Sequence, residues 1–161
     1  NGETCGHLLP GAGVLLNNFL GEEDLQGPAD LVPEVGSRIR TMMTPTLVRL
    51  ADGTRVVLGS GGANRIRSAL LQGIVHLVDA GADLATAVTR PRIHFEGGVC
   101  RVELPGMPAG ELEHLERALG RLTRYDDLHM YFGGLHAVAL RAGGGFGGAG
   151  DPRRGGSYGE V

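Results

Sequence analysis

Residues 59–66 read Gly59-Ser60-Gly61-Gly62-Ala63-Asn64-Arg65-Ile66, a run of small residues that leads into an expected amphipathic helix. Glycines lack the Cβ atom that blocks close approach to the backbone, and the amide N–H groups at a helix start carry positive partial charge. Such a corner can bind an anion or stabilise an oxyanion in a transition state. The structural alternative is that Gly61-Gly62 only turns a strand into a helix.

The segments on the N-terminal side of this run predict strands and loops. Residues 46–50 and 55–58 flank Asp52-Gly53, which is a strong β-hairpin signal. Val14 to Leu16 predicts a short buried strand that ends at Asn17-Asn18. The acidic, proline-bearing stretch from Gly21 to Gly36 predicts an ordered loop or surface excursion.

The segments on the C-terminal side predict helices alternating with hairpins. We expect a helix from Asn64 to about Asp79, a short helix over 84–89 capped by Asp83, and a helix over 108–119 ended by Gly120. A second hairpin is expected around Gly97-Gly98, and a further strand over 135–140. This order favours an α+β fold with helices packed on an antiparallel sheet, formed by residues 1–161 as a single domain.

Composition narrows the classes of function. The 161 residues are 42% hydrophobic and 20% charged, as in a globular protein, and the net charge of −3 gives no footprint for nucleic acid. All 15 basic residues are arginine, which excludes lysine-based covalent catalysis on this chain. No apolar run is long enough to span a bilayer, and nothing in the first residues reads as a signal peptide, which leaves a signal on a precursor open. The absence of an initiating Met suggests a fragment or a processed chain, so the compartment stays open.

Cysteine, histidine and the last glycine cluster give weaker signals. Cys5 and Cys100 form no CxxC motif; ordinary buried thiols are favoured, and sequence leaves their pairing open. The six His residues show no metal-binding spacing, so no metal is expected. Gly143, Gly145 and Gly148 match G-x-G-x-x-G, but no helix follows them, which argues against a dinucleotide site. Asp151 and Arg153 are expected to form a turn with a local, structural ion pair.

Four blocks in order carry a family resemblance: residues 10–18 (PGAGVLLNN), 41–46 (TMMTPT), 59–66 and 148–153 (GAGDPR). Together they resemble the small subunit of γ-glutamyltranspeptidase-like enzymes, which are N-terminal-nucleophile hydrolases. The resemblance covers nearly the whole chain. It implies part of a four-layer αββα sandwich, a large subunit cut from the same precursor as partner, and chemistry that needs no metal or organic cofactor.

The resemblance also implies a catalytic scheme. In the family, an N-terminal threonine attacks a γ-glutamyl amide and its own α-amino group, or a nearby water, serves as the base. That threonine would precede Asn1, and the chain's internal threonines lack a free α-amino group, so we expect the chain alone to be inactive. The oxyanion hole falls on Gly62 and Ala63, where Ala63 replaces a second glycine.

Substrate recognition is assigned by the same resemblance. Asn1 and Asp24 match the residues that hold the α-carboxylate and α-ammonium groups, and a carboxylate is the natural partner of an ammonium. Thr41 matches the first of two serines, whereas Met42 replaces the second and removes a hydroxyl. A solvated acidic loop around Glu22 to Asp24 and an ordinary strand-edge role for Thr41 are the structural alternatives.

The expected function is therefore γ-glutamyl transfer or hydrolysis, with glutathione-like amides as donors and water or amines as acceptors. Two alternatives stay open. One is a different amide acylase of the same superfamily, which would keep the oxyanion corner and change residues 41 and 42. The other is a non-catalytic domain that keeps only the fold.

Overall fold

The computed structural model describes residues 4–22 and 33–159, and the chain divides into two compact units, residues 1–43 and 44–161. No helix in the described residues is long and apolar enough to cross a membrane.

The first unit contains an antiparallel hairpin of β1 (Thr4–Leu9) and β2 (Val14–Asn17), followed by a 3₁₀ turn, η1 (Phe19–Gly21). The predicted strand over 14–16 is confirmed, but the prediction that it is buried is wrong, since all four residues of β2 are exposed. The two thiols are free, and Cys5 is exposed where burial was favoured, while Cys100 is buried as expected.

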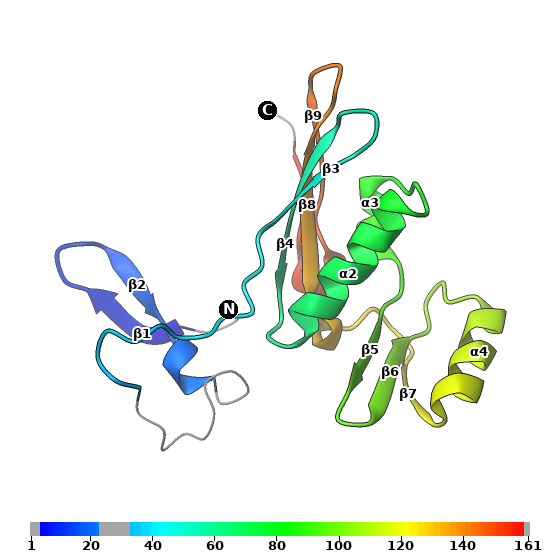
Figure 1. Ribbon diagram of the computed structural model, residues 1–161, viewed down its shortest axis with the longest axis horizontal. Helices are drawn as coiled ribbons and strands as arrows, with labels where there is room; N and C mark the ends of the chain where they lie inside the picture. The colour runs from blue at the N-terminus through cyan, green and yellow to red at the C-terminus, as the bar shows by residue number, and fades with distance from the viewer. Residues whose placement is uncertain (1–3, 23–32, 160–161) are drawn as a thin grey trace. The chain divides into compact units, whose positions relative to one another are not determined.

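The second unit is built on a four-stranded antiparallel sheet in the order β3-β4-β8-β9 (Figure 1). Its strands are β3 (Thr46–Arg49), β4 (Arg55–Gly61), β8 (Gly134–Leu140) and β9 (Phe146–Ala149). The predicted first hairpin is confirmed, because Asp52 accepts a hydrogen bond from the Thr54 amide (2.9 Å) and Gly53 has φ of 88° at the turn. Burial alternates along β4, so Val56 and Leu58 face inward and Val57 faces outward.

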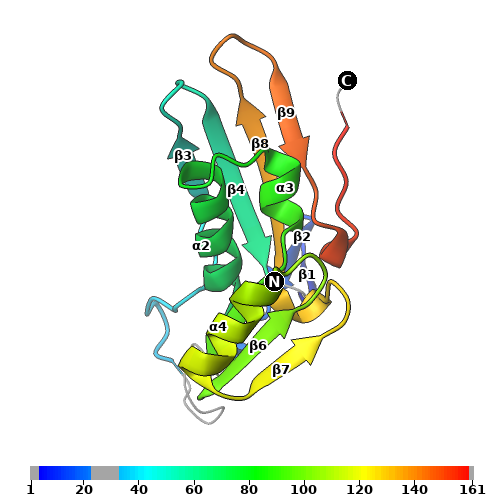
Figure 2. The same cartoon turned by 90° about the vertical axis from the view of Figure 1, so that its right-hand side faces the viewer.

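Two helices cover one face of this sheet, as Figure 2 shows. They are α2 (Arg65–Val78) and α3 (Leu84–Thr89), and both match the sequence prediction. The Asp83 carboxylate caps α3 by accepting the Thr86 amide at 2.7 Å. The apolar stripe of α2 packs against the inward side chains of β4 and β8, and the buried residues of this core include Val56, Leu58, Ile66, Ala69, Leu70, Leu77, Leu135, Ala137 and Ala139.

The opposite face of the sheet carries exposed apolar side chains. The strand register aligns Leu47, Val57 and Val138 in one row, and Leu140 pairs with Phe146 in the next. These five side chains, 39–66% exposed, are called the outer sheet face below. A patch of this kind is typical of a surface that packs against another element.

A smaller three-stranded sheet completes the second unit. β5 (Ile93–Glu96) and β6 (Val99–Glu103) form the predicted hairpin, and α4 (Ala109–Leu119) connects β6 to the parallel strand β7 (Leu122–Tyr125). Cys100, Val102 and Leu122 form its core, against which Leu112 and Leu115 of α4 pack. The prediction of an antiparallel sheet is therefore correct for β3-β4-β8-β9. The β6–β7 pair is parallel, because a helix crosses between its strands.

Candidate active site

The turn between β4 and α2 is formed by Gly62 and Ala63, as predicted. Gly62 has φ of 139°, and Ala63, with φ of 49°, is the one non-glycine among the described residues in the left-handed region. The Arg65 and Ile66 amides donate to the Gly62 and Ala63 carbonyls at 3.1 and 3.0 Å. Within residues 4–22 and 33–159, neither the Gly62 nor the Ala63 N–H donates a turn or loop hydrogen bond. Two amides next to the helix start are thus left for an anion or an oxyanion.

Close backbone packing requires glycine at this turn. A Cβ atom at Gly62 would lie 2.8 Å from the Cα of Gly133, and one at Gly133 would lie 2.9 Å from the Gly61 carbonyl oxygen. Gly133 lies between the 3₁₀ turn η2 (Met130–Phe132) and β8. The sequence analysis did not single out Gly133, because its place opposite Gly61 depends on the pairing of β4 with β8.

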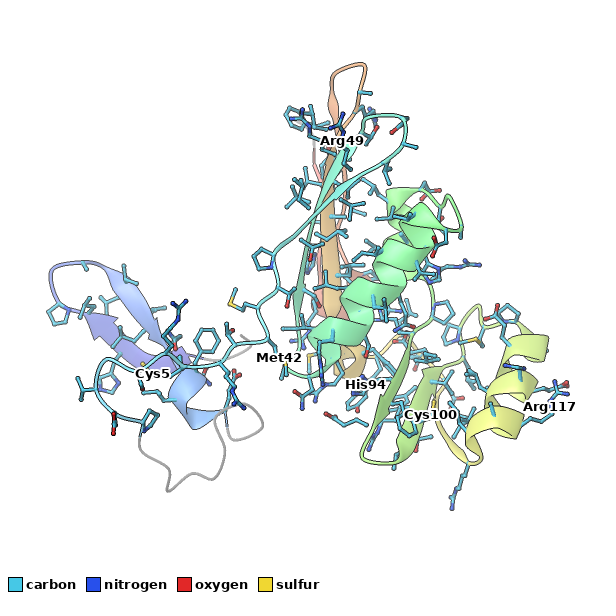
Figure 3. All side chains as sticks on the ribbon, viewed as in Figure 1. Cys5, Met42, Arg49, His94, Cys100 and Arg117 are labelled. Carbon is cyan, nitrogen blue, oxygen red and sulfur yellow. The ribbon has the colours of Figure 1, made fainter. Side chains whose placement is uncertain are left out.

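A chain of polar side chains supports the first turn of α2. The side-chain amide of Asn64 donates a hydrogen bond to Oε1 of Glu96 at 2.8 Å. Nε2 of His94 lies 3.3 Å from Oε2 of Glu96, and Nδ1 of His94 lies 2.7 Å from Oγ of Ser68. His94 is buried on β5 (Figure 3). Burial on its own would raise the pKa of Glu96, but hydrogen bonds from His94 and Asn64 and the charge of Arg65 lower it. Glu96 is therefore an anion that fixes the residue before α2.

A buried ion network joins three distant parts of the second unit. Arg92 contacts Asp151 at 2.6 Å, and Arg153 contacts Glu103 at 2.5 Å and Asp151 at 3.2 Å. Asp151 also accepts the Leu135 amide at 2.7 Å. The expected local pair of Asp151 and Arg153 is present, and the network fixes the 3₁₀ turn η3 (Pro152–Arg154) against the start of β8. Sequence reasoning missed Arg92 and Glu103, since nothing local marks them as its partners.

The predicted substrate-binding residues lie elsewhere in the chain. Thr41 and Met42 belong to the first unit, on the segment that precedes β3, where Figure 3 marks Met42. Thr41 is exposed, and its hydroxyl oxygen accepts the Met43 amide at 3.1 Å. Asn1 and Asp24 lie outside the described residues. The assignments of these four residues to substrate binding stay predictions.

Solved structures with this arrangement of sheet, helix layer and turn are N-terminal-nucleophile hydrolases, which confirms the α+β class and the sandwich fold to which the chain contributes. A mutant of the γ-glutamyltranspeptidase from Helicobacter pylori superposes with a TM-score of 0.70 at 28% sequence identity, covering 93% of this chain and 87% of that chain. The family model of γ-glutamyltranspeptidase matches residues 4–161. The chain belongs to the γ-glutamyltranspeptidase family.

Two curated relatives are similar in sequence. The acylase ACY 1 proenzyme of Pseudomonas sp. (strain SE83) is 36% identical over 95 residues, 59% of this chain and 17% of the relative. The glutathione hydrolase proenzyme of Bacillus subtilis (strain 168) is 37% identical over 90 residues, 55% of this chain and 15% of the relative. The matched part is thus a small fraction of either relative, and both are proenzymes.

Proposed function

We propose that the complete protein cleaves γ-glutamyl amides and passes the γ-glutamyl group to water or to an amine. The observation that carries this proposal is the Gly62-Ala63 turn, whose two N–H groups are not used by the turn itself. Family membership supplies the rest of the scheme. In it, a threonine with a free α-amino group attacks the scissile carbonyl, and negative charge develops on the carbonyl oxygen beside the Gly62 and Ala63 amides.

The scheme has two steps, acylation of the threonine and transfer of the γ-glutamyl group to the acceptor. The threonine oxygen bonds to the carbonyl carbon, the C–N bond breaks, and the hydroxyl proton passes through the base to the leaving amine. A γ-glutamyl ester remains on the threonine. Water or a second amine then attacks the ester, gives up a proton and restores the hydroxyl. The Gly62-Ala63 turn would serve both steps, since each passes through an oxyanion.

Substrate recognition is proposed to rest on Asn1, Asp24 and Thr41, with Met42 as the departure from the family pattern. An Asp24→Ala variant of the complete protein is expected to lose about 1.5–3 kcal/mol of binding, roughly ten- to a hundredfold, for γ-glutamyl-p-nitroanilide. Met42→Ser is expected to raise kcat/KM by about fivefold, since one added hydrogen bond contributes about 1 kcal/mol. Glutaryl-p-nitroanilide, which lacks the α-amine and keeps the carboxylate, is the comparison substrate.

The outcome on the two anilides decides the assignment. If Asp24→Ala weakens binding of both anilides equally, or of neither, Asp24 does not bind the α-ammonium group. A wild-type enzyme that prefers the glutaryl anilide would favour the second candidate function, an amide acylase with another acyl group. Met42 favours that candidate, because it removes a hydroxyl at a position proposed to hold the α-carboxylate, and one similar relative is named an acylase.

The proposed partner is a large subunit from the same precursor, and the outer sheet face is its proposed docking surface. Val57 and Val138 are adjacent in the register and about half exposed, at 53% and 48%. Covering this face with a second sheet would complete the central layers of a four-layer sandwich. Each valine fully buried there would contribute about 1.5–3 kcal/mol.

A charge on this face should therefore block assembly. We expect Val57→Glu and Val138→Glu to lower the yield of the two-subunit protein at least about tenfold, because an unpaired carboxylate would be buried in the interface. Val78→Glu is the matched control, since Val78 is 51% exposed on α2, on the opposite side of the sheet. Co-purification of the subunits gives the measurement. An unchanged yield for Val138→Glu would place the partner on another surface.

A further inference from the structure

The Asn64 side chain bonds to a neighbouring strand instead of capping its own helix. Asn64 is the N-cap residue of α2, a position at which asparagine usually accepts a hydrogen bond from an amide of the first turn. In the part of the chain that the structure describes, no such cap bond forms, and φ of −57° and ψ of −24° place Asn64 already in the helical region. Its side chain donates to Glu96 instead, 32 residues away. A local cap has thus been exchanged for a contact with β5.

The same face of α2 contacts β5 at two further positions. Asn64, Ser68 and Gln72 are spaced four residues apart, so they lie one above the other on the helix. The Ser68 hydroxyl contacts His94, and Gln72 both accepts the Ile93 amide and donates to the Ile93 carbonyl, each at 2.9 Å. This polar stripe of three side chains therefore joins α2 to β5 over two helical turns.

One histidine and one carboxylate link the two ends of the first turn of α2. An ionised carboxylate only accepts hydrogen bonds, so the Nε2 atom of His94 that faces Glu96 carries a proton. With one proton on the ring, Nδ1 accepts the Ser68 hydroxyl. The His94 ring is 4% exposed, and its centroid lies 6.0 Å from that of Tyr131 in an edge-on arrangement. The ring is thus held on several sides, and it holds the carboxylate that binds Asn64.

We infer that Glu96, together with His94 acting through it, is a positioning residue for the oxyanion turn. This inference rests on the proposed function. Backbone N–H groups are aimed only by the residues that flank them. On the strand side, Gly62 packs against Gly133. On the helix side, Ala63 is followed directly by Asn64, whose side chain Glu96 binds. The strained φ of 49° at Ala63 needs such support, because an alanine free to relax would leave the left-handed region.

The charge of Glu96 on its own would oppose the reaction. A carboxylate near the turn repels the negative charge that develops on the scissile carbonyl oxygen. The Arg65 cation acts on the same carboxylate and offsets part of this repulsion. A charge effect and a positioning effect therefore predict opposite results. Removing the carboxylate should raise kcat if repulsion dominates, and should lower kcat if the hydrogen bond to Asn64 is what matters.

The test measures kcat and KM for γ-glutamyl-p-nitroanilide, using the complete processed protein and values per folded molecule. Glu96→Ala is expected to lower kcat about tenfold and to change KM by less than about twofold, because an oxyanion donor stabilises the transition state rather than the bound substrate. Glu96→Gln should stay within about threefold of wild type, since its oxygen still accepts from Asn64. His94→Phe keeps a ring and should lower kcat about threefold, because Glu96 loses one of its partners.

Gln72→Ala is the matched control. It removes two hydrogen bonds between the same helix and the same strand, but two helical turns away from Asn64. We expect it to lower the thermal stability and to leave kcat and KM unchanged. A loss of kcat equal to that of Glu96→Ala would overturn the inference, since general loosening of α2 on β5 would then explain both variants.

The other outcomes also decide between the explanations. An unchanged or higher kcat for Glu96→Ala contradicts a positioning role, and a higher kcat for Glu96→Gln as well would show that repulsion dominates. If the wild-type protein cleaves glutaryl-p-nitroanilide and not the γ-glutamyl anilide, the proposed donor fails, and the same variants on the glutaryl compound still measure the role of Glu96. Cleavage of neither anilide overturns both.

Discussion

Replacing Asp151 with asparagine is expected to lower the free energy of unfolding by about 3–5 kcal/mol, because the change removes the charge that balances two buried guanidinium groups. Asp151 contacts Arg92 at 2.6 Å and Arg153 at 3.2 Å, and its side chain is fully buried. Asparagine has nearly the same shape, so the loss reports the charge rather than a cavity. Unfolding of the complete protein in guanidinium chloride, monitored by circular dichroism, measures this free energy.

An exposed ion pair of the same unit provides the control. Arg124 and Glu116 are paired on the surface, with side chains 47% and 40% exposed. Glu116→Gln is expected to change stability by less than about 1 kcal/mol, since solvent and salt screen exposed pairs. Equal effects of Asp151→Asn and Glu116→Gln would show that the network adds nothing beyond a surface contact.

The same carboxylate makes stability depend on pH. Burial on its own would raise the pKa of Asp151, but Arg92, the Leu135 and Arg153 amides and the Arg153 charge together hold it below the ordinary value of 3.8. The folded form therefore binds the proton more weakly than the unfolded chain does. The stabilisation is fully present above the unfolded pKa and is lost as the pH falls through the folded one.

The second large effect concerns the turn itself. Gly62→Ala is expected to lower kcat for γ-glutamyl-p-nitroanilide about 10²–10³-fold, the loss typical when an oxyanion donor is removed. The new Cβ atom would lie 2.8 Å from Cα of Gly133, and φ of 139° is a conformation that alanine rarely adopts. The turn must therefore rotate, which moves the Gly62 and Ala63 amides away from the scissile carbonyl.

Ala63→Gly is the matched control for this experiment. Ala63 already has φ of 49°, so glycine relieves strain there and should preserve kcat, with a gain in stability of at most about 1 kcal/mol. Both variants are compared per folded molecule, using circular dichroism to measure the folded fraction. A Gly62→Ala enzyme with normal kcat would remove this turn from the catalytic scheme.

Local patterns explain what the sequence predicted well. The hairpin around Asp52-Gly53, the cap at Asp83 and the apolar stripe of α2 each depend on residues within a few positions of one another. The glycines before α2 belong to the same class of signal. This is why the place of the Gly62-Ala63 turn at the helix start could be predicted.

Long-range packing explains what the sequence missed. Gly143 to Gly148 looks like a loop, yet β9 begins at Phe146. A Cβ atom at Gly147 would lie 3.0 Å from Nη2 of Arg141, and one at Gly148 would overlap the Tyr158 ring, so these glycines accommodate side chains rather than turns. The partnership of Arg153 with Glu103 likewise joins positions 50 residues apart, which no local pattern records.

The buried ion network also constrains the order of events during protein synthesis. Arg92 and Glu103 leave the ribosome well before Asp151 and Arg153, which balance their charges in the finished fold. Until those last partners emerge, burial would leave Arg92 and Glu103 each without the ion pair that it makes in the finished fold. At about 5–20 residues per second, the 47 residues between Glu103 and Asp151 take seconds to translate. The network can therefore close only after Asp151 and Arg153 have emerged, which makes it one of the last contacts of the second unit to form.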